Sequence, residues 1–305
     1  MSKRLRDPWP TDSAARVGAI LDAFQSIYIP TPSHQIIHQQ CDILRHTSRN
    51  RKGKAMGALR LAQLSSASKT ACFENYCQNA IAKHATLTGE SNPYVVLYVS
   101  LLSCTSPKAL CQEICRKLGD ENWQVGTASD LLHRMRNFIA RAGVELIIID
   151  EVQELKGKRN DRKDVTNLLK SLLNMGVAPL VLVGDETSSD MFQDNIHLAN
   201  RAGAELKLKP YSLEDTSRLG EFKGFCLDLE NEMLRQRLVS HAGVLSNGKQ
   251  QKILLKWSGG HIGRVCRIMA QALQHSALRC AASVEEQDLR YAIENFAIPN
   301  GYRTV

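Results

Sequence analysis

The sequence lacks any pair of cysteines at Cys-x-x-Cys spacing, and its nine cysteines are scattered and odd in number. This arrangement argues against a disulfide framework, so we expect reduced and mostly buried thiols. The tightest cysteine group is Cys104, Cys111 and Cys115, and no histidine lies at ligand spacing from it. A structural zinc site is therefore not expected.

Long apolar runs are also missing from the chain. No segment approaches the length of a membrane-spanning helix, and the first ten residues have no apolar core of the kind found in signal peptides. The sequence shows neither an internal repeat nor a low-complexity tract. We therefore expect a cytoplasmic protein without a membrane partner.

Aromatic residues make up only 6% of the chain, and they do not alternate with basic residues as single-strand stacking surfaces require. Positive charge, in contrast, is in excess, because 39 lysines and arginines oppose 31 acids and give a net charge of +8. This excess is compatible with binding to a polyanion, although many soluble proteins are equally basic. The basic run Arg45–Lys54 is either a solvated loop or a contact to DNA phosphates.

The most informative stretch is Gly143–Glu151, in which the apolar run Leu146–Ile149 ends in the carboxylates of Asp150 and Glu151. Such short, uninterrupted runs are typical of strands buried on both faces of a parallel sheet, and open α/β sheets bind ligands where these strands end. Four apolar residues followed by Asp-Glu form the Walker B pattern of ATPases. There the first carboxylate holds Mg²⁺ and the second polarises the attacking water. The other interpretation is a buried strand that ends in two solvated acids.

A phosphate-binding loop is predicted near residue 65. The short strand Ala58–Ala62 is followed by a loop of small residues, by Lys69 and Thr70, and by a helix, which is the layout of Gly-x-x-x-x-Gly-Lys-Ser/Thr loops. Gln63 and Ser68 replace the two glycines, whose amides approach phosphates in conformations that are costly for other residues. Taken alone, Ser-Lys-Thr is usually the start of a capped helix. The strand before it and the carboxylate pair after it favour the phosphate loop.

Strands and helices alternate over the first two thirds of the chain. Besides the two strands above, strands are expected at 93–102, 178–183 and 205–208, interleaved with helical segments. Strand signals stop at Pro210, and helices are expected near 212–223, 229–242, 247–257, 262–279 and 285–296. We therefore predict an arm and helix (1–30), a three-layer α/β/α domain (31–210) and an all-helical domain (211–305).

Together these features resemble the AAA+ ATPases. More narrowly, the chain is similar to the TniB/TnsC family, the ATP-dependent regulators of Tn7-like (including CRISPR-associated) and mercury-type transposons. The resemblance extends over roughly residues 30–301. Its motifs are apolar-Asp-Glu-Val-Gln-Glu-Leu at 146–155, Leu-Val-Gly at 182–184, Asn-Ile-His-Leu-Ala-Asn-Arg at 195–201, Leu208–Pro210, Ser258–Arg264 and the tail Ala292–Gly301. The resemblance implies an AAA+ P-loop domain with a C-terminal helical lid.

The resemblance also implies roles for individual residues. It places Lys69 at the β- and γ-phosphates of ATP, Thr70 and Asp150 at Mg²⁺, and Glu151 at the attacking water. Arg201, expected on a helix over 195–202, resembles an arginine finger that reaches the γ-phosphate bound by a neighbouring subunit. The other interpretation of Arg201 is a surface salt bridge.

Further nucleotide contacts follow from the same resemblance. The loop residues Ser65, Ser66, Ala67 and Ser68 are expected to surround the phosphates. Arg264 resembles the sensor 2 arginine of the lid, with Arg267 as its rival. Asp185 stands at the sensor 1 position, where the family has an uncharged polar residue, and Thr187 is the substitute. A carboxylate there repels the γ-phosphate unless a cation compensates. With the missing glycines, this predicts a slow ATPase or one that binds ATP without turnover.

The implied function is assembly on double-stranded DNA, driven by ATP and Mg²⁺, into a ring or filament. The homo-oligomer would connect a target selector, TniQ-like or RNA-guided, with a DDE transposase of the TniA/TnsB type, and hydrolysis would release it. Candidate contacts to DNA phosphates, each otherwise a solvated charge, are Lys108, Lys156, Lys158, Arg159 and Arg162. Two other interpretations stay open: a pseudo-ATPase scaffold for DNA and proteins, and another AAA+ ATPase such as a helicase loader.

Overall fold

The computed structural model describes residues 9–64, 68–102, 104, 106–156, 159–189 and 200–302. Within these ranges the chain divides into two compact units. An α/β unit comprises residues 33–64 and 69–208, and a helical unit comprises residues 9–32 and 209–302 together with Ser68.

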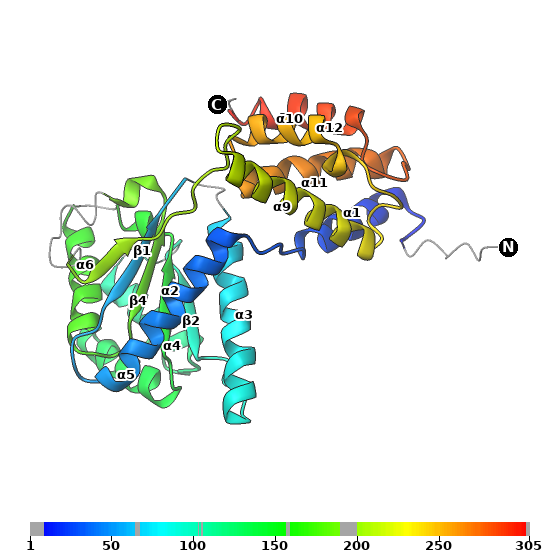
Figure 1. Ribbon diagram of the computed structural model, residues 1–305. Helices are drawn as coiled ribbons and strands as arrows, with labels where there is room; N and C mark the ends of the chain where they lie inside the picture. The colour runs from blue at the N-terminus through cyan, green and yellow to red at the C-terminus, as the bar shows by residue number, and fades with distance from the viewer. Residues whose placement is uncertain are drawn as a thin grey trace. The chain divides into compact units, whose positions relative to one another are not determined.

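The α/β unit is built on a parallel sheet (Figure 1). Its described strands are β1 (Ala58–Ala62), β2 (Val96–Ser100), β3 (Leu146–Asp150), β4 (Leu180–Gly184) and β5 (Ala202–Glu205). Their order is β2-β3-β4-β1-β5, so β4 lies between β1 and β3. In register, Ala62 pairs with Gly184 and Ser100 pairs with Asp150. The carboxyl-terminal ends of these four strands therefore meet at one edge of the sheet.

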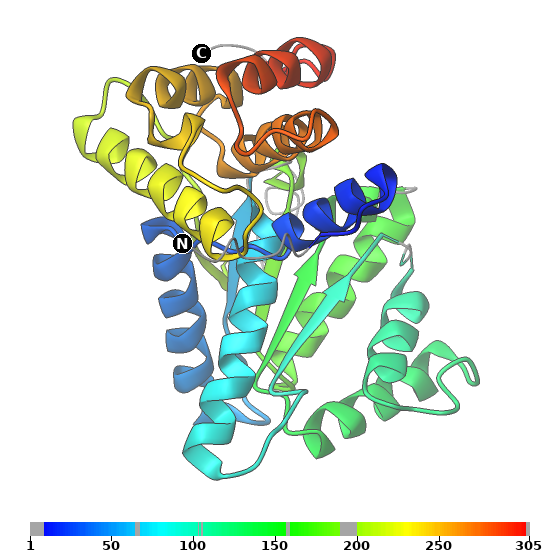
Figure 2. The same cartoon turned by 90° about the vertical axis from the view of Figure 1, so that its right-hand side faces the viewer.

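Helices cover both faces of this sheet (Figures 1 and 2). One face carries α4 (Pro107–Lys117), α5 (Ala128–Arg141) and α6 (Arg159–Asn174), and the other carries α2 (Pro32–Ser48) and α3 (Lys69–Thr88). Ile147 and Ile149, at alternate positions of β3, pack in one core with residues of α4, α5 and α6. Every residue of β3 is buried. Burial on both faces is the physical reason for the uninterrupted apolar run in the sequence.

The helical unit consists of α1 (Ser13–Gln25), α9 (Thr216–Arg235), α10 (Gly248–Ser258), α11 (Ile262–Leu278) and α12 (Glu286–Ala292). A short 3-10 turn, η4 (Val244–Ser246), precedes α10, and a π-helical turn, η5 (Ile293–Ala297), continues α12. Val17, Ile20 and Phe24 of α1 are buried in the same apolar core as the C-terminal helices. The N-terminal helix therefore contributes to the core of helices that lie far away in the sequence.

Two expectations about secondary structure were wrong. Two helices were expected between 212 and 242, but the single helix α9 spans most of that region, because Phe222, Phe225 and Leu229 continue one buried face through it. The fifth strand was expected at 205–208, but β5 begins at Ala202, where its pairing partner β1 sets its position. Within the described ranges, no helix is both long and apolar enough to cross a membrane.

Candidate functional site

The polar residues that the sequence analysis singled out gather at the carboxyl-terminal edge of the sheet. Gln63 follows β1, Asp150 ends β3 and Asp185 follows β4. The backbone amide of Gln63 donates to the carbonyl oxygen of Gly184 at 3.1 Å, so the pairing of β1 with β4 continues into the loop. Helix α3 begins at Lys69, and the first amides of a helix carry the partial positive charge that binds phosphate.

Lys69 is buried, with 8% of its surface exposed. Its ammonium group donates to the carbonyl oxygens of Gln63 at 2.6 Å and Leu64 at 3.5 Å. Burial lowers the pKa of Lys69 below its ordinary value, while the negative charges of Asp150 and Glu151 act in the opposite direction. Because neutral carbonyls are weaker partners for an ammonium than anionic oxygens, a phosphate can replace them.

Two hydroxyl groups converge on one carboxylate oxygen of Asp150. The hydroxyl of Thr70 lies 3.3 Å from Oδ2 of Asp150, and the Tyr98 hydroxyl donates to the same oxygen. Asp150 itself is only 2% exposed. Burial, assisted by the hydrogen bond to Asp150, raises the pKa of Tyr98, so its hydroxyl keeps its proton at neutral pH. Tyr98 was not predicted as a site residue, although its hydroxyl is a polar group within an otherwise apolar strand.

Gln153 links the residues that follow β3 and β4. Its amide nitrogen donates to the Glu151 carboxylate, and its amide oxygen accepts from the backbone N–H of Asp185 at 3.0 Å. Gln153 lies in η2 (Val152–Lys156). Glu151 has a φ of 60°, a left-handed conformation in which the chain turns directly after β3. Gln153 was predicted only as part of a motif, because its contacts with both segments depend on the pairing of β3 with β4.

Asp185, the expected sensor 1 residue, turns its carboxylate toward its own chain. The carboxylate accepts from the backbone N–H of Thr187 at 2.9 Å and from the hydroxyl of Thr187, and so caps the turn η3 (Glu186–Ser188). Thr187, the substitute for the same role, is therefore engaged with Asp185.

Ser68 occupies the position of the second loop glycine, and its φ is 66°. This left-handed conformation costs a non-glycine residue about 1–2 kcal/mol. The chain thus keeps a glycine-like backbone at Ser68 although the glycine is absent. Ser65, Ser66 and Ala67 lie outside the described residues.

The side chains at this edge fit a magnesium nucleotide. The Thr70 hydroxyl and the Asp150 carboxylate are hard oxygen ligands, which Mg²⁺ prefers in combination with phosphate and water. Lys69 and the amino-terminal end of α3 supply the positive charge that phosphates require. In the part of the chain that the structure describes, no three His, Cys, Asp or Glu side chains cluster as a metal cage.

Arg201 lies apart from this group. It is partly buried and directly precedes β5, and its carbonyl oxygen accepts from the backbone N–H of Ala58 at 2.9 Å. A turn rather than a helix therefore carries Arg201, and residues 190–199 of the expected helix lie outside the described residues.

Arg264 belongs to the first turn of α11 in the helical unit. Its guanidinium carbon lies 4.8 Å from the centre of the Tyr302 ring, a cation–π contact that draws the last described turn of the chain to α11. Arg267, the rival sensor 2 residue, is exposed, whereas Arg264 is partly buried.

The predicted DNA contacts are described only in part. Lys108 is exposed in the first turn of α4, as a phosphate contact requires. Lys158 lies outside the described residues, and the structure describes only the backbone of Lys156, Arg159 and Arg162.

Several solved structures are similar to this chain. The Aeropyrum pernix Orc1 protein in complex with DNA has a TM-score of 0.64 and 14% identity, over 90% of this chain and 69% of that chain. The Aeropyrum pernix ORC2 protein in its ADPNP–ADP complexes has a TM-score of 0.62 and 16% identity, over 89% and 71%. Domain III of the Thermotoga maritima replication initiation protein DnaA has a TM-score of 0.53 and 14% identity, over 95% and 99%. At these identities the likeness establishes the fold, which is that of the AAA+ ATPases with a C-terminal helical lid.

Sequence comparisons assign the family. No curated protein sequence matches the chain significantly. The family model described as bacterial TniB protein, in contrast, matches residues 28–212, which is more than half of the chain. This segment contains Lys69, Thr70, Asp150, Glu151 and Arg201. The chain therefore belongs to the bacterial TniB protein family.

Proposed function

We propose that this protein is an ATP-dependent regulator of transposition that assembles on double-stranded DNA. The oligomer, a ring or filament, connects a TniQ-like or RNA-guided target selector with a DDE transposase of the TniA/TnsB type. Membership of the TniB family supports the role in transposition. The observation that carries the ATP-dependent part is the meeting of Thr70 and Asp150 next to Lys69 at one edge of the sheet.

Different residues of this chain have different roles in ATP hydrolysis. Thr70 and Asp150 hold Mg²⁺, which supplies charge neutralisation to the phosphates when it is bound. Tyr98 orients Asp150 through its hydrogen bond. Glu151 orients the attacking water, and Gln153 fixes the Glu151 carboxylate. Lys69 neutralises phosphate charge after it exchanges its carbonyl partners for the nucleotide.

Assembly and hydrolysis are coupled through Arg201. An arginine that neutralises charge in the active site of a neighbouring subunit makes turnover depend on oligomerisation. Arg264 connects nucleotide binding to the helical unit, as the resemblance implies. Lys108 and the other candidate basic residues contact DNA phosphates. Binding to DNA is therefore independent of base sequence and weakens as salt is added.

The replaced loop glycines favour a second candidate, a scaffold that binds DNA and proteins but no longer uses ATP. The Lys69 ammonium group already donates to the carbonyl oxygens of Gln63 and Leu64, so it has hydrogen-bond acceptors without a nucleotide. Thermal unfolding with and without Mg·ATP separates the two candidates, because a ligand that binds only the folded state raises the unfolding midpoint. A raised midpoint in the wild type, lost in Lys69→Ala, supports the ATP-dependent protein. An unchanged midpoint supports the scaffold.

ATP hydrolysis with and without duplex DNA tests the proposal further. We expect DNA-stimulated turnover that is lost in Glu151→Gln and in Arg201→Ala. Glu154→Gln is the matched control, because Glu154 is exposed and lies in the same segment as Glu151. Turnover that survives Glu151→Gln contradicts the catalytic assignment. Turnover that is independent of Arg201 contradicts a site shared between subunits.

A further inference from the structure

A pocket of about 300 Å³ lies at the opposite edge of the sheet from the nucleotide site. Its wall includes Gly143–Glu145, which precede β3, and Val177–Pro179, which precede β4. Lys69, Asp150 and Asp185 belong to the other edge, where the strands end. The pocket is therefore separate from the residues proposed to bind ATP.

The pocket combines an apolar floor with a basic rim. Met56, Val144 and Ala178 line it and are each no more than 3% exposed. The basic lining residues come from the end of α2 and from the chain that follows it through η1 (Arg49–Arg51); they are Arg45, Arg49 and Lys52. This is the basic run that the sequence analysis left open between a solvated loop and a phosphate contact.

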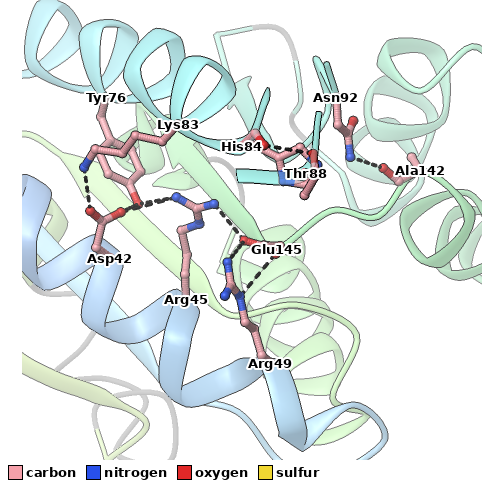
Figure 3. A network of polar contacts seen from close by, with 10 residues as sticks. All are labelled: Asp42, Arg45, Arg49, Tyr76, Lys83, His84, Thr88, Asn92, Ala142 and Glu145. Carbon is pink, nitrogen blue, oxygen red and sulfur yellow. Dashed lines mark hydrogen bonds and ion pairs between the residues drawn. The ribbon is translucent and has the colours of Figure 1, made fainter. Parts of the chain in front are cut away.

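A chain of ion pairs fixes the rim (Figure 3). Arg45 donates to Glu145 at 2.7 Å, and Arg49 donates to the same carboxylate at 3.3 Å. On its other side Arg45 is paired with Asp42 at 3.3 Å, and Asp42 with Lys83 at 3.1 Å. Only 8% of the Arg45 side chain is exposed, so its position is set before any ligand arrives.

The lining nevertheless keeps an excess of positive charge. Arg45, Arg49 and Lys52 contribute three positive charges and Glu145 contributes one negative charge, which leaves +2 without counting His84. Within the described residues the Lys52 side chain has no ion-pair or hydrogen-bond partner. The buried Nε of Arg45 also has no hydrogen-bond partner there. The pocket is therefore suited to an anion that can bring apolar surface with it.

We propose that this pocket docks an acidic peptide segment of a partner protein, with a carboxylate at Lys52 and Arg49 and an apolar side chain on the floor. Charge complementarity selects the acid, and the buried floor selects a neighbouring apolar residue. A doubly charged phosphate fits less well than a singly charged carboxylate, because Glu145, which pairs with Arg45 and Arg49, repels two negative charges more strongly than one. Duplex DNA does not satisfy the apolar floor, because its phosphates lie on a convex, charged surface.

Binding to an array of immobilised octapeptides tests the proposal. The probes alternate Asp or Glu with Leu, Val or Phe, and each has a counterpart in which Asn and Gln replace the acids. The variant is Lys52→Glu, and Lys54→Glu is the matched control, because Lys54 is also exposed, lies two residues away and does not line the pocket. Both variants change the net charge equally. Peptide binding of both variants is also measured in a Lys69→Ala background. This separates a loss of nucleotide binding from a loss of peptide binding.

We expect the wild type to retain acidic peptides over their amide counterparts, and Lys52→Glu to weaken this binding by at least about tenfold. Lys54→Glu and Lys69→Ala should leave the binding within about twofold of the wild type, less than the effect of one buried contact. Equal retention of acidic and amide peptides would overturn the proposal, and so would equal losses in Lys52→Glu and Lys54→Glu. A loss of duplex DNA affinity in Lys52→Glu without a loss of peptide binding would make this surface a DNA contact instead.

Discussion

The hydroxyl of Thr70 lies 3.3 Å from Oδ2 of Asp150, although the two residues are 80 positions apart in the sequence. Thr70 belongs to the first turn of α3 and Asp150 to the end of β3. The parallel sheet brings these two elements to the same edge, where Tyr98 of β2 donates to the same carboxylate oxygen. Side chains of α3 and β2 thus contact one carboxylate oxygen of β3.

Tyr98→Phe should raise the Mg²⁺ concentration that nucleotide binding and hydrolysis require, while leaving the fold intact. The substitution removes the donor to Asp150 and keeps the ring. Because a hydrogen bond to a charged group contributes about 1.5–3 kcal/mol, we expect about a tenfold higher Mg²⁺ concentration for half-maximal nucleotide protection or hydrolysis. Tyr94→Phe is the control, since Tyr94 packs against the apolar core beside the same strand. Equal Mg²⁺ requirements in the two variants would show that Tyr98 does not position Asp150.

In the absence of Mg·ATP, Ser68→Gly should increase the free energy of unfolding. Glycine avoids the cost of about 1–2 kcal/mol at φ 66° but loses about 0.5–1 kcal/mol through the greater freedom of the unfolded chain. A net gain of about 0.5–1 kcal/mol should appear in urea unfolding. Ser68→Ala keeps the unfavourable conformation and is expected to give no such gain. Destabilisation by glycine would mean that the serine side chain contributes more than its backbone costs.

Stability should fall as the pH decreases from about 6.5 to about 4 because of His34. Burial, and next the nearby His38, lowers the pKa of His34 from 6.5 to about 4. In this pH window the unfolded chain binds a proton at His34 and the folded chain does not, so acid favours unfolding. The contribution is about 3 kcal/mol across the full window. Urea unfolding at several pH values should give a shallower pH dependence for His34→Gln than for the wild type. Parallel curves for the two proteins would contradict this assignment.

The two arginines that contact Glu145 should differ in their importance for stability. The Arg45 side chain is 8% exposed and the Arg49 side chain 44% exposed. Arg45→Met leaves the carboxylates of Glu145 and Asp42 without their central partner and should cost about 3 kcal/mol. Arg49→Met should cost less than about 1 kcal/mol, because exposed ion pairs contribute little. Urea unfolding of both variants measures the difference, and equal losses would show that burial does not decide the strength of these contacts.

Much of the fold could be predicted from the sequence. The strand predicted at Ala58–Ala62 is confirmed, as is the strand that ends in Asp150, because apolar runs bounded by polar residues depend only on near neighbours. The position of β5 was mispredicted, because an edge strand of four residues carries little periodic signal and is placed by its pairing with β1.

The sequence by itself determined the α/β alternation and the apolar strand that ends in Asp150, because periodicity and the order of apolar and charged residues are properties of neighbouring residues. Only the tertiary structure decided which of these groups meet. The strand order places β4 between β1 and β3, and so allows Gln153 to bridge Glu151 and the backbone of Asp185. The packing of α2 on the sheet likewise brings Arg45 to Glu145, which lies 100 positions away in the sequence. This contact is at the end of the sheet opposite to Asp150. Contacts of this kind arise from the packing of whole elements, for which local sequence contains no signal.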